Sequence, residues 1–478
     1  MDRQLKRVTI AVMLMFLALF TSTTIITVFQ VDSLNADNRN VRTLYDSYSA
    51  ERGPILVNGQ AIAESKPAAD KYKFQRVYSN PQLYSAVTGH FTLNQGNTGV
   101  EGALNNYLSG TANDQFFTKI NSILTGQKPK GGLVSLTIDP KVQQAAWDAL
   151  GNNSGAVVAL NPRTGAILAM VSKAAYDPNV LASHSSNAVI SAYQKLLADP
   201  TKPLINRAIS GDLYYPGSVF KLVTTSAALD SGKYKPEDTF PNPSTLTLTG
   251  TSTNINNAEG GSCGGQATVS IADALRLSCN IPMAQLGAAL GGEELKKYAS
   301  AYGYGQELAI PMRVTPSVYS VGDPAQVQLS AFGQFEDRVT PLQVAMTSAA
   351  IANGGSLMQP TLIKQITAPD LTEIQPFQQK VFGQPITPAT SATMTRLMVN
   401  NVSNGAASNA RISGVEVAGK TGTAQNGDGK PYTLWFTGFA PANDPQVAVA
   451  VVVENGTSFG NAVAAPIAKR VIEAVLGK

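Results

Sequence analysis

Residues that carry many enzyme active sites are scarce in this sequence. Its 478 residues include only two histidines and two cysteines, and 14% of the residues are charged. The two histidines, His90 and His184, stand in no recognisable motif, so we do not expect a Ser-His-Asp triad. The net charge is only +4, with no cluster of lysine or arginine, and we therefore expect no nucleic acid among the partners.

Apolar sequence, by contrast, is plentiful. Hydrophobic residues make up 44% of the chain, which indicates a folded protein, and the length predicts two or three domains. We expect a cytoplasmic tip and membrane anchor at residues 1–31, a small N-terminal domain at 32–130 and a large C-terminal domain at 131–478. The polar residues 32–50 fit a stalk, and the Gly- and Lys-rich residues 126–132 fit a domain boundary.

The N-terminus predicts a membrane anchor. Three basic residues within the first seven precede an uncharged stretch over residues 8–31, which ends at Asp32. About twenty apolar residues suffice to cross a bilayer. The basic flank then stays in the cytoplasm and the remainder of the chain lies outside it. A cleaved signal peptide is the alternative, but the apolar stretch is long and no Ala-x-Ala site follows it.

Periodicity and capping residues predict an α+β catalytic domain. Apolar runs predict strands at residues 133–138, 155–160, 166–171, 414–419, 432–439 and 447–453. Caps and first-turn prolines, together with apolar runs, predict helices at residues 140–150, 222–229, 271–277, 341–352, 388–398 and 464–476. Strands at both ends with helices between them indicate a sheet assembled from distant pieces of chain.

A possible nucleophile stands at the start of one of these helices. In Tyr215-Pro-Gly-Ser-Val-Phe-Lys221, proline and glycine precede Ser218, and Lys221 follows one helical turn later. Burial can make a lysine neutral enough to act as a base. By itself the motif is weak, because Ser-x-x-Lys arises by chance about once or twice in such a chain. A helix cap followed by a solvated lysine is the alternative.

Two further motifs support the catalytic interpretation. Ser278-Cys-Asn280 lies between two helical segments, and Lys420-Thr-Gly422 lies on a strand. We expect Gly422 to lack a side chain because a substrate lies against this strand. The chance that three unrelated turns produce these motifs in this order is far below about one in twenty.

These three motifs resemble those of penicillin-binding proteins and serine β-lactamases. The resemblance covers most of residues 133–478 and includes Leu136-Thr-Ile-Asp139, Thr340-Pro-Leu-Gln343, Ala418-Gly-Lys-Thr-Gly-Thr-Ala424 and Trp435-Phe-Thr-Gly-Phe-Ala-Pro441. Glu51-Arg-Gly-Pro-Ile55 and Gly99-Val-Glu-Gly102 further resemble the N-terminal region of class B enzymes, the monofunctional transpeptidases. The resemblance implies an antiparallel sheet flanked by helices, behind a non-catalytic pedestal of the dimerisation-domain kind.

The resemblance also implies roles for individual residues. Ser218 attacks the penultimate D-Ala carbonyl of a peptidoglycan stem peptide, and Lys221 takes its proton, kept partly neutral by burial and by Lys420. Ser278 relays protons, and Asn280 holds Lys221 and the substrate amide.

Substrate binding is expected at the third motif. The backbone N–H groups of Ser218 and Thr423 form the oxyanion hole, while Lys420, Thr421 and Thr423, beside Gly422, bind the substrate carboxylate. No metal and no organic cofactor are implied. The implied partners are stem peptides, β-lactam antibiotics, the membrane, and proteins of a division or elongation complex.

Several alternatives stay open. The motifs do not distinguish an amine acceptor from water, so a D,D-carboxypeptidase is possible. A β-lactamase needs a further base, and the match Glu101-Gly-Ala-Leu-Asn105 precedes Ser218 in the other domain, which argues for coincidence. A β-lactam sensor is less favoured because the cytoplasmic part is too short for a signalling domain. About 100 residues are too few for an added glycosyltransferase domain.

The two cysteines stand near the second motif. Cys279 is the middle residue of Ser278-x-Asn280, and Cys263 lies in a polar, glycine-rich stretch over residues 252–266. Outside the cytoplasm the two can form a disulfide that pins this stretch beside the motif. Two buried free thiols are the alternative.

Overall fold

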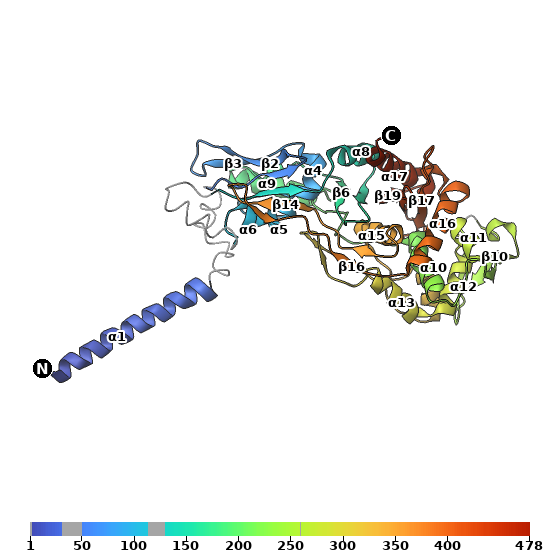
Figure 1. Cartoon of the computed structure of the whole chain (residues 1–478), viewed down its shortest axis with the longest axis horizontal. Helices are drawn as coiled ribbons and strands as arrows, with labels where there is room; N and C mark the ends of the chain where they lie inside the picture. Colours follow the sequence, from blue (N-terminus) through green and yellow to red (C-terminus); the bar gives the residue numbers. More distant parts are fainter. Residues whose placement is uncertain (1, 31–49, 113–129, 259) are drawn as a thin grey trace.

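The structure is a computed structural model that describes residues 2–30, 50–112, 130–258 and 260–478 (Figure 1). Most of the predicted stalk at 32–50, and residues 126–129 of the predicted boundary, lie outside these ranges. The N-terminal stretch forms α1 (Asp2–Thr24), which continues into a π-helical turn, η1 (Ile25–Phe29). The span from Arg3 to Phe29 is long and apolar enough to cross a membrane, as both an anchor and a signal sequence are.

The N-terminal unit is built on a six-stranded sheet in the order β15-β14-β4-β1-β2-β3. Its strands are β1 (Ile55–Val57), β2 (Gln60–Pro67), β3 (Phe74–Tyr78), β4 (Leu133–Leu136), β14 (Ile363–Thr367) and β15 (Glu373–Gln375). The predicted strand at 133–138 is therefore β4, and it pairs in parallel with β1. Short helices accompany the sheet: α4 (Pro81–Thr88), α5 (Gly99–Ala103) and α6 (Asn105–Leu108). Half of this sheet comes from chain beyond residue 130.

A buried ion cluster braces the same unit. Glu101, which is fully buried, accepts a 2.6 Å hydrogen bond from Arg52 and another of 2.6 Å from Arg76. Burial by itself raises the pKa of a carboxyl, but the two guanidinium groups outweigh it and hold the pKa of Glu101 below its ordinary value. Glu101 thus braces the pedestal through Arg52 and Arg76.

The catalytic unit is built on a five-stranded antiparallel sheet in the order β17-β18-β19-β5-β6. Its strands are β5 (Gly155–Leu160), β6 (Ile167–Lys173), β17 (Ala418–Ala424), β18 (Tyr432–Ala440) and β19 (Val447–Gly456). The prediction that distant pieces of chain assemble one sheet is confirmed.

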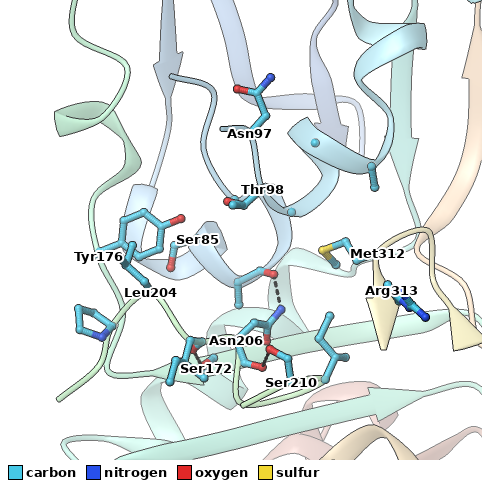
Figure 2. Close-up of a pocket in the computed structure, with 18 residues that line it drawn as sticks. Ser85, Asn97, Thr98, Ser172, Tyr176, Leu204, Asn206, Ser210, Met312 and Arg313 are labelled. Atoms are coloured by element: carbon cyan, nitrogen blue, oxygen red, sulfur yellow. Dashed lines mark hydrogen bonds between the residues drawn. The ribbon is translucent and has the colours of Figure 1, made fainter. Parts of the chain in front are cut away.

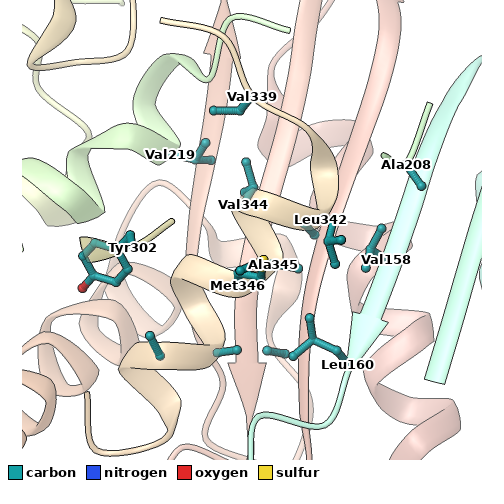
Figure 3. Packing of buried hydrophobic residues seen from close by; sticks show 14 of the residues in the cluster. Val158, Leu160, Ala208, Val219, Tyr302, Val339, Leu342, Val344, Ala345 and Met346 are labelled. Atoms are coloured by element: carbon teal, nitrogen blue, oxygen red, sulfur yellow. The ribbon is translucent and has the colours of Figure 1, made fainter. Parts of the chain in front are cut away.

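Both faces of this sheet are buried, which explains why its strands are continuous apolar runs. Val157 and Val451 face one core with α8 (Pro140–Leu150) and α17 (Gly460–Leu476). Val158 and Val452 face the other core, where α15 (Pro341–Ala352) packs. Figure 3 shows Leu342 and Met346 of α15 beside Val158 and Leu160 of β5.

Most of the remaining helices lie on the side of the molecule away from the pedestal in Figure 1. They are η4 (Gly217–Phe220), α10 (Lys221–Asp230), α11 (Ile271–Arg276), α12 (Ile281–Leu290), α13 (Gly292–Ala301), α14 (Pro324–Ser330) and α16 (Pro388–Asn404). By contrast, α9 (Ser186–Ala198) lies beside the pedestal. Short strand pairs complete the chain: β7 (Thr239–Pro241) with β10 (Thr268–Ser270), β8 (Thr245–Thr247) with β9 (Asn254–Asn256), β11 (Leu308–Ala309) with β12 (Arg313–Val314), and β13 (Leu357–Met358) with β16 (Val381–Gly383).

Several element boundaries differ from the sequence prediction, and two of the larger differences have a clear local cause. The strand predicted at 414–419 begins only at Ala418, because Gly414, with φ +70°, makes a tight turn and Ile412 pairs with Val415 in an isolated bridge. The helix predicted to end at residue 398 continues to Asn404, because Val402 extends its buried face by another turn.

Candidate active site

Two cavities compete as the functional site. One, of about 400 Å³, lies at the joint between the pedestal and the catalytic unit, where Asn206 Nδ2 donates to the Ala86 carbonyl at 2.8 Å (Figure 2). The other, of about 580 Å³, is lined by residues of all three sequence motifs: Ser218, Ser278, Asn280, Thr421, Gly422 and Thr423. The joint cavity contains none of the predicted residues, so the second cavity is the candidate active site.

Ser218 is held by a close approach of three backbone segments. It lies in the 3-10 turn η4, directly before α10. The preceding Gly217, with φ +53°, donates its N–H to the Gly333 carbonyl at 2.8 Å. A Cβ on Gly217 would lie 3.0 Å from that of Ala424 on β17. Glycine at 217 is therefore required both by the positive φ and by the contact with the strand.

Lys221 is fully buried in the first turn of α10. Its Nζ donates to the Ser278 carbonyl at 2.7 Å and to Asn280 Oδ1 at 2.8 Å. Burial, and secondly the charge of Lys420, lowers the pKa of Lys221 well below its ordinary value. A lowered pKa of this kind makes an amine suited to accept a proton.

Lys420 reaches the same turn from β17. It is also fully buried, and its Nζ donates to Ser278 Oγ at 2.7 Å and to the Thr421 carbonyl at 2.9 Å. Burial lowers the pKa of Lys420 to about 7. Ser278 thus accepts a hydrogen bond from Lys221 at its carbonyl and one from Lys420 at its hydroxyl.

The turn between α11 and α12 presents Ser278 in this way. Ser278 has φ +62°, a left-handed conformation that is uncommon for a residue with a side chain. The N–H of Cys279 donates to the Ala274 carbonyl at 2.9 Å, which closes α11 before the turn. Cys279 is joined to Cys263 by a disulfide, so the bridge that the sequence left open is present.

Gly422 lines the cavity and also packs closely against the protein. A Cβ at this position would lie 3.1 Å from Trp435 Cβ, 3.2 Å from the Pro216 carbonyl oxygen and 3.2 Å from Val219 Cγ1. Pro216 and Val219 belong to the loop and turn that carry Ser218. The packing of this turn against β17 therefore also limits the size of residue 422, and the contact of Gly422 with a substrate stays a prediction.

Sequence reasoning missed part of the cavity wall. Asn257, Asn404, Asn409, Phe459 and Asn461 also line it. They stand outside the three motifs, and only Asn257 falls in a stretch that the sequence marked, the glycine-rich residues 252–266. None of the described residues that line the cavity carries a carboxylate.

The two histidines lie elsewhere. His90 is buried in the pedestal, where its Nδ1 lies 2.8 Å from the Tyr176 hydroxyl, and His184 pairs with Asp70. Burial lowers the pKa of His90 to about 4. Neither residue lines the candidate active site.

Known proteins match both units of the chain. The penicillin binding protein transpeptidase domain matches residues 155–473, and the penicillin binding protein A dimerisation domain matches residues 52–134. The chain is 41% identical to the peptidoglycan D,D-transpeptidase PbpA of Mycolicibacterium smegmatis, covering 100% of this chain and 99% of that protein. PbpA of Mycobacterium tuberculosis is also 41% identical, at the same coverage.

A solved structure matches as well. The ceftriaxone acyl-enzyme complex of penicillin-binding protein A from M. tuberculosis superposes with a TM-score of 0.87 at 39% identity, covering 90% of this chain and 100% of that one. The chain therefore belongs to the penicillin-binding protein transpeptidase family. Within that family it is a class B protein that resembles PbpA along its whole length, as the compact pedestal and single anchor predicted.

Proposed function

We propose that this chain is a membrane-anchored peptidoglycan D,D-transpeptidase that cross-links stem peptides through an acyl-enzyme on Ser218. The observation that carries the proposal is the environment of Lys221: the amine is fully buried, its pKa is lowered, and Ser278 and Asn280 hold it beside the Ser218 turn. A neutral amine at this place is the base that a serine nucleophile needs when no histidine is near.

The proposed acylation proceeds in two steps. Ser218 Oγ attacks the penultimate D-Ala carbonyl carbon while its proton passes to Lys221. The backbone N–H groups of Ser218 and Thr423 stabilise the resulting oxyanion, each worth about 3–4 kcal/mol in a well-studied enzyme. The C–N bond then breaks, and the leaving D-Ala amine takes a proton that Ser278 relays from Lys221.

The acceptor completes the cross-link. An amine from a neighbouring stem peptide attacks the acyl carbon, its proton returns through Ser278 and Lys221 to Ser218 Oγ, and the new amide leaves. Lys420, Thr421 and Thr423 bind the carboxylate that ends the donor peptide, and the same contacts bind the carboxylate of a β-lactam. The relatives that match along the whole chain are named peptidoglycan D,D-transpeptidases, which supports this function over that of a β-lactamase.

Mass spectrometry after addition of penicillin tests the proposal. A long-lived adduct on Ser218, followed over hours, supports a penicillin-binding transpeptidase, whereas an adduct that turns over within minutes indicates a β-lactamase. A stem-peptide substrate with and without an added D-amino acid amine then separates the acceptors. Amide product supports transpeptidation, and exclusive release of the free acid indicates a carboxypeptidase.

The proposal includes the setting of the enzyme. Retention of α1 as an anchor, with Arg3 and Lys6 on the cytoplasmic side, places the catalytic unit outside the membrane, where peptidoglycan is built. Proteins of a division or elongation complex are the proposed macromolecular partners. Crosslinking of the full-length protein in its membrane tests for these partners. A variant without α1 that leaves the membrane and loses the same crosslinks supports the role of α1 as an anchor.

A further inference from the structure

Asn280 occupies the N-cap position of α12 but does not cap the helix. At this position asparagine normally accepts a hydrogen bond from a backbone N–H two or three residues later. The Asn280 side chain makes no such bond. Its Oδ1 accepts instead from Lys221 Nζ at 2.8 Å, and its Nδ2 donates to the Asn256 carbonyl at 3.1 Å. The carboxamide is thus committed to the lysine.

A second asparagine, from outside the helix, supplies an acceptor at this helix end. Asn257 Oδ1 accepts from the backbone N–H of Asn280 at 2.9 Å and from that of Ile281 at 3.1 Å. The next residue, Pro282, has no N–H to satisfy. Asn257 is only 6% exposed, and its Nδ2 donates to the Gly261 carbonyl at 3.1 Å. Asn257 thus makes all three bonds from the wall of the candidate active site, while its own side chain is nearly buried.

We propose that Asn257 is a positioning residue of the transpeptidase reaction. By accepting the N–H groups of Asn280 and Ile281 it fixes the backbone at the start of α12, from which the Asn280 carboxamide reaches Lys221. This inference deepens the proposed function and rests on it. Without Asn257 these two N–H groups lose their acceptor. The Asn280 side chain cannot replace it, because an N-cap side chain accepts from the second or third residue of its helix, and the second is Pro282. The start of α12 then shifts, and Asn280 leaves Lys221.

Asn242, which follows β7 and binds the same loop, offers a matched control. Asn242 is also buried and also makes three hydrogen bonds, but all of them go to the disulfide side of the loop. Its Oδ1 accepts from the Cys263 N–H at 3.1 Å, and its Nδ2 donates to the carbonyls of Cys263 at 2.7 Å and Gln266 at 2.8 Å. None of these three side-chain hydrogen bonds goes to the turn of Ser278 and Asn280. Loss of Asn242 loosens the loop without removing the acceptor at α12.

The experiment compares the acylation rate constant with penicillin, as a function of pH, in wild type, Asn257→Ala and Asn242→Ala. Asn257→Ala should lower the plateau rate constant by about tenfold or more, the effect of one unsatisfied buried group. Its acid limb should also move to lower pH, because Lys221 loses an acceptor that favours its charged form. Asn242→Ala should keep the wild-type acid limb even if its melting temperature falls as much as that of Asn257→Ala.

A conservative variant keeps the test decisive if the alanine variant does not fold. Asn257→Asp retains both accepted bonds and places a negative charge at the helix N-terminus, where it is favoured. Its plateau rate should stay near that of wild type, while its acid limb moves to higher pH because the carboxylate favours the protonated lysines. The two Asn257 variants thus shift the limb in opposite directions.

Several results would overturn the inference, and each can be told from the others. An unchanged rate and profile in Asn257→Ala, or the same shift in Asn242→Ala, overturns the positioning role and assigns Asn257 to loop stability. An acid limb in Asn257→Asp that stays in place also overturns it. A wild-type protein that forms no penicillin adduct overturns the proposed function, and this inference with it.

Discussion

The amine of Lys420 donates a 2.7 Å hydrogen bond to the hydroxyl of Ser278, although the two residues lie 142 positions apart in the chain. This bond joins the third motif to the second. Lys221 joins the first motif to the same residue through the Ser278 carbonyl. Among the ion pairs of the described residues, none includes Lys221 or Lys420, so both buried amines lack a carboxylate that would hold them charged. The site therefore favours neutral lysines at the expense of stability.

The nucleophile is tested by Ser218→Ala. The variant should form no covalent adduct with penicillin, because its β-carbon carries no oxygen to acylate. Its free energy of unfolding should change by less than about 0.5 kcal/mol, since the side chain is only part-buried at the cavity wall. Intact-mass measurement and urea unfolding check the two parts. Labelling that persists on another serine contradicts the assignment.

The charge of Lys420 is tested by the pH profile of acylation. Lys221 accepts a proton only in its neutral form, so the rate rises with pH through the Lys221 pKa, which the Lys420 charge depresses. Lys420→Ala removes that charge, and the acid limb should move up, on the order of one pH unit. Lys430→Ala, at an exposed lysine of the hairpin after β17, is the control and should leave the limb in place. An unmoved limb in both variants means that the two lysines do not interact.

Stability should show the cost of the buried charge. The pKa of Lys420 falls from an ordinary 10.5 to about 7 on folding. Between these values the unfolded chain binds a proton that the folded protein does not, so the folded state gains stability as pH rises and loses it as pH falls toward 7. Lys420→Met has no charge to bury. Its stability relative to wild type should therefore be greatest at pH 6 and decline by pH 9 in urea unfolding. A difference independent of pH refutes the low pKa.

Local signals in the sequence were sufficient for several helices, such as α8 and α15, whereas α9, α13 and α14 were not predicted. Asp139 caps α8 through the N–H groups of Lys141 and Val142, and Thr340 caps α15 through that of Gln343, as their spacing predicts. Such caps act within one helical turn and can be read from neighbouring residues. Asn257 could not be found in this way, because the helix it serves begins more than twenty residues later and no local pattern links them.

Long-range pairing was the other limit. The strand at 133–136 has the pattern of a half-buried strand, but nothing in it indicates that β1 is its neighbour on one side and β14 on the other. The division of the chain at residue 130 stays a prediction, and limited proteolysis of the ectodomain is its test. The packing of the Ser218 turn against Gly422 could not be predicted either, because it joins two distant parts of the chain.

The contact between β17 and the nucleophile turn is tested by Gly422→Ala. The added methyl group meets Trp435, Pro216 and Val219 at 3.1–3.2 Å, and overpacking of this kind costs about 1–3 kcal/mol. Because η4 must shift to make room, acylation should slow as well. Gly383→Ala is the control: its nearest contact is the Ala301 carbonyl at 3.8 Å, so stability and acylation should change little. Wild-type acylation in Gly422→Ala shows that the turn tolerates the shift.

The disulfide joins the polar, glycine-rich residues 252–266 to the second motif. Cys263 and Cys279 are 16 residues apart, and closing such a loop is worth about 3 kcal/mol in the chain-entropy model. Cys279 is 1% exposed and lies between Ser278 and Asn280. Reduction should therefore slow acylation of Ser218, because the loop that carries Asn257 loses its anchor beside the motif.

Reduction should affect the active site more than the pedestal. Acylation by penicillin is measured with and without a phosphine reductant, and alkylation confirms that two thiols have formed. A Cys263→Ala/Cys279→Ala variant is the control for effects of the reductant itself, and it should acylate slowly under both conditions. Thermal unfolding followed in the pedestal should change less than the acylation rate. Full reduction of the wild-type protein with an unchanged rate constant shows that the bridge contributes stability alone and does not position the second motif.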